Sequence, residues 1–205
     1  MQRTAQSHLS PARLKKRRRQ DPRVKYFGFT WRQWEFLFVL FGNWLFALAF
    51  LIICKMVWDW QPEQWETTGD KIGLVIKDSV FAILPGVIGI CIVAAQRLNP
   101  NMFVGKMAKP NSPLDINTRF ILNTFEQFTA YFVAHAALAI YSPAEEARTV
   151  VILTALFVLG RILFWIGYHK NPHLRAFGFG LTFYPTVAAY ICLVIYMTTG
   201  IRVPL

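Results

Sequence analysis

Five long blocks of apolar residues constrain this chain more than any other feature of its sequence. They cover about 36–57, 79–95, 120–141, 150–168 and 176–198 of the 205 residues. A transmembrane helix needs roughly 20 consecutive apolar residues, and uninterrupted blocks of this kind are typical of membrane spans. The chain is only 16% charged, whereas soluble domains are about 25% charged. The sequence therefore predicts an all-α membrane protein with five crossings and no sizeable soluble domain.

The blocks divide the chain into four parts. We expect a basic tail over 1–35, one additional transmembrane helix over 36–57, an acidic loop over 58–78 and a four-helix transmembrane bundle over 79–200. The tail carries ten Lys or Arg, with a net excess typical of a flank that faces anionic lipid. No folded basic domain accompanies this run, so nucleic acid is not an expected partner.

Loop charges predict the orientation of an integral multi-pass protein. The segments between the blocks alternate between basic and acidic along the chain. The positive-inside bias then places the N-terminus in the cytoplasm and the C-terminus on the opposite side. Both an endomembrane and a bacterial inner membrane fit this topology. It also gathers Arg97, Arg119, Tyr168 and Arg175 at the cytoplasmic ends of their helices.

The third block carries a polar stripe. Arg119, Asn123 and Glu126 are spaced i, i+4 and i+7, so they share one helix face and must turn toward a neighbouring helix or an aqueous cavity. Arg161 lies at the same expected depth in the fourth block, which predicts that it pairs with Glu126. The three cysteines lie inside apolar blocks and no metal-ligand spacing is present, so no metal site is expected.

The order of these polar residues resembles the MAPEG family, the membrane-associated proteins of eicosanoid and glutathione metabolism. The resemblance lies in Arg119-x-x-x-Asn123-x-x-Glu126 on one span, then Gly160-Arg161, then Tyr168 and Arg175 around the next hairpin. Gln96-Arg97 is similar to an arginine that ends the family's first helix. The similarity covers about 79–198, and the extra leading helix resembles the mattrin-like branch of the family.

This resemblance implies a homotrimer of four-helix bundles that binds glutathione as a co-substrate between subunits, with hydrophobic substrates entering from the membrane lipids. Carried over by position, the glutathione-binding residues are Arg97, Arg119, Asn123, Glu126, Tyr168 and Arg175, and the catalytic residues are Arg161 and Tyr168. The chemistry is consistent, because arginines bind carboxylates through two parallel hydrogen bonds and a nearby cation favours thiolate over thiol.

Two functions remain open from the sequence. The first is a glutathione-dependent transferase or peroxidase that acts on hydrophobic substrates. The second is a non-catalytic, mattrin-like membrane protein in trafficking or scaffolding. Leu122, Phe164 and Phe179 favour the second, because they replace polar residues of a family enzyme. A transporter is weaker, since no matched pair of broken helices is present.

Simpler roles also remain open for the polar residues. Arg161 and Glu126 could form a buried pair that only fixes helix register. Tyr168 could be an interfacial aromatic, and Arg97 and Arg175 could be positive-inside charges.

Overall fold

We describe a computed structural model of the chain, which covers residues 25–26, 28–99, 108–171 and 174–202. The chain divides into two compact units, Met1–Gly42 and Asn43–Leu205, which we describe separately. The basic run expected at 15–19 lies outside the described residues.

The described part of the first unit is a short hairpin followed by a helix. Strands β1 (Lys25–Tyr26) and β2 (Phe29–Thr30) pair antiparallel around Gly28, whose φ of 84° is accessible to glycine without strain. Helix α2 (Trp31–Val57) then begins five residues before the predicted apolar block. Two reciprocal hydrogen bonds cap its start: Thr30 N donates to Gln33 Oε1, and Gln33 N donates to Thr30 Oγ1.

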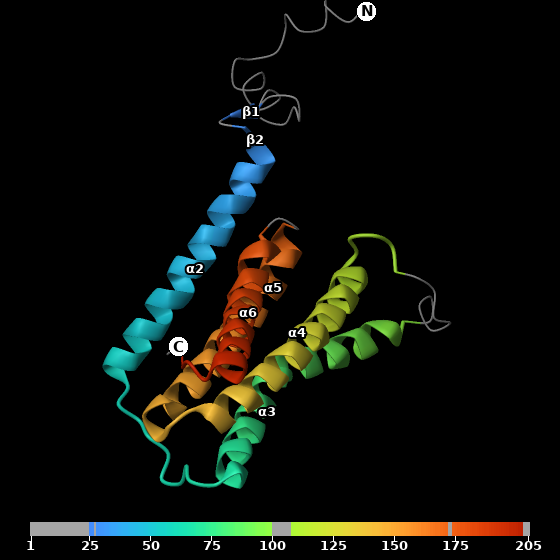
Figure 1. Cartoon of the computed structure of the whole chain (residues 1–205). Helices are drawn as coiled ribbons and strands as arrows, with labels where there is room; N and C mark the ends of the chain where they lie inside the picture. Colours follow the sequence, from blue (N-terminus) through green and yellow to red (C-terminus); the bar gives the residue numbers. More distant parts are fainter. Residues whose placement is uncertain (1–24, 27, 100–107, 172–173, 203–205) are drawn as a thin grey trace, which may run out of the picture. The chain divides into compact units, whose positions relative to one another are not determined.

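The second unit contains the end of α2 and four further long helices. These are α3 (Thr68–Arg97), α4 (Pro113–Tyr141), α5 (Ala147–Lys170), which follows the short helix η2 (Ala144–Glu146), and α6 (Arg175–Thr199). Helices α3 to α6 pack against one another, with α4 and α5 each contacting the other three (Figure 1). The expected all-α architecture and the bundle over the last four helices are therefore present.

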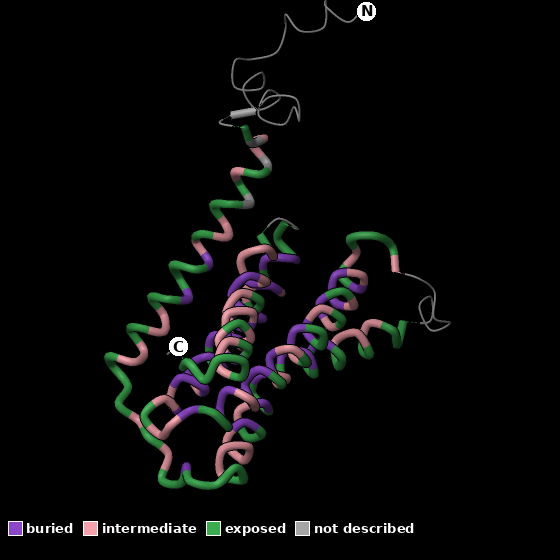
Figure 2. The backbone as a smooth tube through the Cα atoms, in the orientation of Figure 1, coloured by how far each residue is buried: buried purple, intermediate pink, exposed green. Residues whose placement is uncertain are grey.

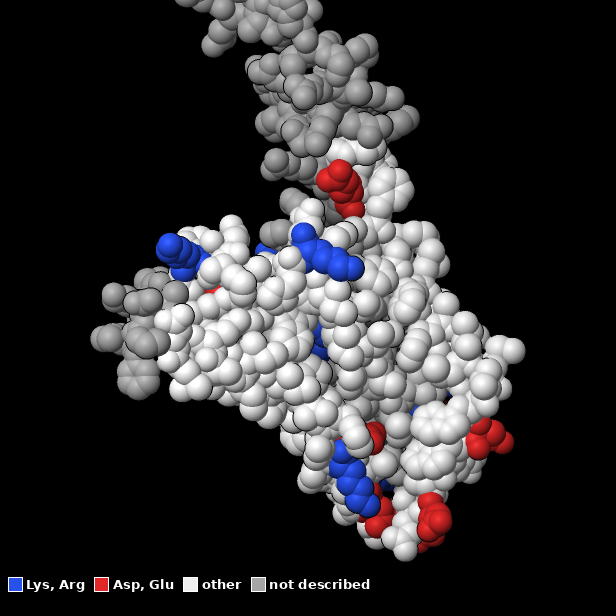
Figure 3. Space-filling view, turned by 180° about the vertical axis from the view of Figure 1, so that it is seen from behind, with Lys and Arg blue, Asp and Glu red and all other residues white. Residues whose placement is uncertain are grey.

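Four of the long helices have the length and composition of membrane spans. They are Gln33–Val57, Thr68–Arg97, Ala144–Lys170 and Arg175–Thr199, so the chain is an integral multi-pass membrane protein. Helix α4 is equally long but falls outside this set, because it carries the polar stripe and several further polar residues. On the second unit, charged side chains gather toward the ends and the surface between them is largely uncharged (Figure 3). Five crossings remain a prediction.

Helix α3 begins eleven residues before the predicted block, so the connection from α2 is shorter than expected. A capping box explains the early start: Asp70 N donates to Thr67 Oγ1 over 3.1 Å, and Thr67 N donates to Asp70 Oδ2 over 3.0 Å. The charged first turns are also tethered, because Lys71 Nζ donates to the carbonyls of Ile140 and Ser142, each over 3.0 Å. The local capping box and the long-range bonds of Lys71 together outweigh the low hydrophobicity of the segment.

The core lies between the four helices, where purple segments face one another in Figure 2. On α3, a Cβ added at Gly89 would lie only 3.0 Å from Ile121 and 3.1 Å from Phe120 of α4. Small residues at such positions let membrane helices approach closely. This contact occupies the face of α4 that carries Phe120 and leaves the Arg119–Asn123–Glu126 face free for another neighbour.

Candidate ligand site

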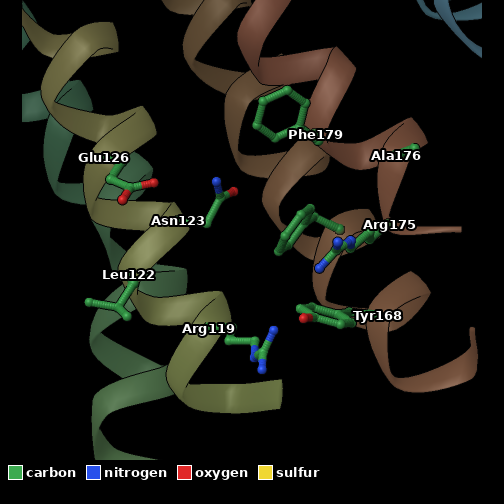
Figure 4. Close-up of a pocket in the computed structure, with 9 residues that line it drawn as sticks. Arg119, Leu122, Asn123, Glu126, Tyr168, Arg175, Ala176 and Phe179 are labelled. Atoms are coloured by element: carbon green, nitrogen blue, oxygen red, sulfur yellow. The ribbon is translucent and has the colours of Figure 1, made fainter. Parts of the chain in front are cut away.

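A cavity of about 460 Å³ lies between α4 and the α5–α6 hairpin. Its lining comes from three helices and combines charged, polar and aromatic side chains: Arg119, Leu122, Asn123, Glu126, Phe164, Tyr168, Arg175, Ala176 and Phe179. Figure 4 shows Arg119, Asn123 and Glu126 along α4, facing Tyr168, Arg175 and Phe179 across the space. Five of the residues predicted to bind glutathione therefore line one cavity.

The α4 side of the cavity offers one cation, one amide and one carboxylate. Arg119 Nε donates to Asp115 Oδ1 over 3.0 Å, and 57% of the Arg119 side chain stays exposed. Asp115 thus holds the guanidinium of Arg119 through its Nε, and Tyr168 also interacts with it, which leaves further N–H donors of the guanidinium for a ligand. Glu126 is exposed, and within the described residues it forms no ion pair. Its carboxylate is available to a cation that is not part of this chain.

The hairpin side of the cavity is built on a stacked pair. Tyr168 of α5 is buried, and the guanidinium carbon of Arg175 lies 4.5 Å from the centre of its ring. Such a cation–π contact contributes about 0.5–2 kcal/mol and holds the arginine in place. The Phe164 ring meets the same tyrosine edge-on at 5.7 Å. Arg175 is therefore positioned by aromatic side chains and keeps its donors for the cavity.

Arg161 is the most deeply placed charge of the structure's described part, with none of its surface exposed. Its Nη1 donates to Asn123 Oδ1 over 2.9 Å, and its Nη2 donates to Thr182 Oγ1 and, over 3.5 Å, to the carbonyl of Gly178. The Phe164 ring centre lies 4.8 Å from its guanidinium carbon. The arginine thus joins α4, α5 and α6 in the core beside the cavity, and it does not line the cavity itself.

The bond from Arg161 also sets the orientation of Asn123. Because a guanidinium only donates, the asparagine must present its oxygen to Arg161 and its amide nitrogen elsewhere. Asn123 lines the cavity, so its NH₂ group is a donor available to a ligand carboxylate or carbonyl there. The buried Arg161 thereby determines that Asn123 presents its amide nitrogen, and not its oxygen, to the cavity.

Two glycines let α5 and α6 approach closely enough for this network. A Cβ on Gly178 would lie 2.1 Å from the backbone nitrogen of Phe164, and one on Gly160 would lie 2.7 Å from Thr182 Cγ2. No side chain fits at either point without moving backbone or a packed hydroxyl residue. The close crossing brings the Gly178 carbonyl and the Thr182 hydroxyl within reach of Arg161.

The predicted pairing of Glu126 with Arg161 is wrong in this structure. Arg161 donates to Asn123, one turn before Glu126, and no ion pair joins the two charges. The reason is that the Thr182 and Gly178 oxygens of α6 draw the guanidinium into the core. Arg97 ends α3, which packs on a different face of α4, and within this single chain it does not line the cavity.

Asn117 is a polar junction that the sequence interpretation missed. Trp165 Nε1 donates to its Oδ1 over 2.9 Å, and His169 Nε2 approaches the same atom at 2.8 Å. Its own Nδ2 donates to Gln96 Oε1 over 3.2 Å. It therefore ties α3, α4 and α5 together. Its spacing from Arg119 places it off the polar stripe, and it precedes the predicted apolar block at 120–141, so the sequence carried no clear signal for it.

The cavity suits a small ligand that carries both anionic groups and a cation. Two guanidinium groups and an amide donor can hold carboxylates, and one carboxylate can hold an ammonium. The apolar members Leu122, Phe164 and Phe179 leave few other polar contacts. In the described part of the chain, no group of three or more His, Cys, Asp or Glu side chains is placed to hold a metal ion.

Comparison with known proteins identifies relatives of this bundle. The model of the MAPEG family matches residues 79–195, more than half of the chain. Transmembrane protein 79 of Mus musculus is 26% identical over 131 residues, and that of Bos taurus is 26% identical over 133 residues. Each alignment covers 64% of this chain but 33% of the relative, so the chain spans about a third of their length. No solved structure matches the chain.

Proposed function

Because this chain belongs to the MAPEG family, we propose that its cavity binds glutathione and that the protein acts without glutathione-transferase or peroxidase chemistry. Its role is then that of a glutathione-responsive membrane protein in trafficking or scaffolding. The proposal rests on one observation above all: Arg161 is buried in the core and does not line the cavity, while the cavity keeps a set of charges that fits glutathione.

Charge matching supports glutathione as the ligand. The tripeptide carries two carboxylates and one ammonium, and the cavity presents Arg119 and Arg175 together with Glu126. In the proposed arrangement each arginine holds one carboxylate, Glu126 holds the ammonium, and the Asn123 amide donates to a peptide carbonyl. Charge-assisted hydrogen bonds of this kind contribute about 1.5–3 kcal/mol each.

We infer the absence of transferase or peroxidase chemistry from the residues that would surround the thiol of a bound glutathione. Transfer to an electrophile needs the thiolate, which a nearby free cation or donor stabilises. Arg161 does not line the cavity, and its Nη1 and Nη2 donate to Asn123, Thr182 and Gly178, so it is not placed to contact a thiolate there. Phe164 and Phe179 offer no donor there.

A catalytic function is the second candidate, and Tyr168 is the residue that favours it. Its side chain lines the cavity opposite Arg119, and the two face each other in Figure 4. A phenol hydroxyl beside a guanidinium could hold a thiolate at this end of the site, with hydrophobic co-substrates arriving from the lipid. In this candidate Tyr168 and Arg161 are the catalytic residues, as the family resemblance implies.

The proposed assembly is a homotrimer with the N-terminus in the cytoplasm and the C-terminus on the other side. Glu126 and Arg119 are exposed on a single chain, and a neighbouring copy would enclose them and bring further donors, including Arg97, to the site. The alternating loop charges support the orientation.

One preparation of purified, detergent-solubilised protein tests both candidates. Binding is measured by titrating glutathione, and turnover is measured with a generic electrophile and with an organic hydroperoxide. The non-catalytic proposal expects saturable binding with no turnover above the uncatalysed rate. Turnover that is lost in Tyr168→Phe, with binding retained, would establish the catalytic candidate instead. A protein that neither binds nor turns over glutathione would refute both.

A further inference from the structure

A second cavity, of about 770 Å³, lies where the α2–α3 loop meets the first turns of α3. It is separate from the glutathione site and has a different character. The lining residues that matter here are an indole, two carboxylates, an ammonium and two glycines: Trp60, Glu63, Asp70, Lys77, Gly69 and Gly73. Neither Glu63 nor Lys77 forms an ion pair within the described residues.

This cavity lies at a surface of the membrane. The loop 58–67 joins two helices that both qualify as spans, so it must lie where they leave the bilayer. Trp58 and Trp60 stack in this loop with ring centres 5.5 Å apart, and Trp65 follows a few residues later. Indoles favour the headgroup layer of a bilayer. Figure 3 shows acidic side chains gathered at this end of the second unit, with a basic one beside them.

The two glycines have no role in packing that the structure shows. A Cβ on Gly73 would meet nothing within 4 Å, and one on Gly69 would meet only Thr67 Oγ1 at 3.4 Å. Neither residue has a positive φ. A glycine inside a helix costs roughly 0.5–1 kcal/mol relative to alanine, so two of them here need a compensating reason. They leave open a channel on α3 that side chains would fill.

The charges along this channel are ordered. Lys77 lies seven residues after Asp70 on the same helix face, which is about 10 Å farther into the membrane. Asp70 uses Oδ2 in the capping box with Thr67, so its other carboxylate oxygen remains available. The carboxylates and the Trp60 ring therefore lie toward water, and the ammonium lies toward the hydrocarbon, from where a lysine can snorkel upward.

Below Lys77 the same face of α3 becomes apolar. Val80, Phe81 and Leu84 are three, four and seven residues farther on, and their side chains are 60%, 63% and 47% exposed. This continuous apolar surface starts where the charged channel ends.

We propose that this channel binds the headgroup of a zwitterionic phospholipid, such as phosphatidylcholine. In such a lipid the phosphate is attached next to the glycerol and acyl chains, and the ammonium lies beyond it. The phosphate then meets Lys77, the ammonium meets Glu63, Asp70 and the face of Trp60, and the acyl chains run along Val80, Phe81 and Leu84. The glycines allow the headgroup to lie against the backbone of α3.

Native mass spectrometry of the full-length protein in detergent tests the proposal. Dioleoyl phosphatidylcholine and dioleoyl phosphatidylglycerol are titrated separately, and the dissociation constants of the first bound lipid are compared. The second lipid keeps the phosphate and the chains but lacks the ammonium. We expect phosphatidylcholine to bind about 10- to 150-fold more tightly, the size of one charge-assisted contact.

Matched variants distinguish this channel from general lipid contact. Gly73→Leu extends a side chain into the channel from a Cβ that would meet nothing within 4 Å, and it should abolish the preference for phosphatidylcholine. Gly42→Leu is the control, because Gly42 is also a helical glycine with open space around it but does not line the cavity. Glu63→Gln should reduce the preference, and Lys77→Gln should weaken both lipids. Equal binding of the two lipids by the wild type, or an unchanged preference in Gly73→Leu, would overturn the proposal.

Discussion

The hydrogen bond between Arg161 and Asn123 makes a prediction whose size follows from the structure. Arg161 is fully buried and donates to Asn123 Oδ1 over 2.9 Å. A hydrogen bond to a charged group contributes about 1.5–3 kcal/mol net. A double-mutant cycle with Arg161→Met and Asn123→Leu should therefore give a coupling energy of about 1.5–3 kcal/mol. Glu126→Gln, which lies one turn away with no ion pair to Arg161, should couple to Arg161→Met by less than about 0.5 kcal/mol.

The free energy of unfolding in mixed detergent micelles, followed by circular dichroism as the denaturing detergent increases, measures both cycles. Arg161→Met alone should cost about 3–5 kcal/mol, because three oxygens from α4 and α6 lose their donor. A coupling to Glu126 as large as the coupling to Asn123 would refute the described network. Such a coupling would instead support the ion pair between Glu126 and Arg161 that helical spacing alone suggests.

Three further predictions concern the packing and the assembly. Gly178→Ala should destabilise the protein by more than about 2 kcal/mol, because its Cβ would overlap the α5 backbone. Gly73→Ala should be neutral or stabilising, because its Cβ would meet no other atom within 4 Å. Comparable unfolding free energies for the two variants would contradict the close crossing of α5 and α6. Tags near Lys15 and near Glu63 should be accessible from opposite sides of the membrane, and accessibility from one side would refute the proposed topology. Light scattering with the detergent mass subtracted should give a trimer, and a monomer in several mild detergents would count against the shared site.

Periodicity and hydropathy predicted the helices well, because long apolar segments have few alternatives in a membrane. The spacing of Arg119, Asn123 and Glu126 also predicted a shared face, and these residues do line one cavity. The start of α3 was not predictable from hydropathy. It depends on a capping box at Thr67 and on a lysine that reaches carbonyls at the end of α4.

The partner of Arg161 was beyond the reach of helical spacing. Equal depth suggested Glu126, but the choice depends on how closely α5 and α6 cross, which the glycines at 160 and 178 set. Once that contact forms, the carbonyl of Gly178 and the hydroxyl of Thr182 fix the guanidinium, and Asn123 becomes its third partner. The sequence signal for the close crossing of α5 and α6 was a glycine on each of the two helices. These glycines predict the partner of Arg161 only when they are considered together with its charge.

Calorimetric titration of glutathione into the wild-type protein and Arg119→Ala tests the central proposal most directly. Arg119 contributes an exposed guanidinium to the cavity, and its loss should weaken binding by about 10- to 150-fold if one charge-assisted contact of about 1.5–3 kcal/mol disappears. Arg202→Ala is the matched control, since Arg202 is also an exposed arginine but does not line the cavity. Saturable wild-type binding that Arg119→Ala weakens in this range supports the account. No heat of binding at millimolar glutathione, or equal affinity in the wild type and Arg119→Ala, would contradict it.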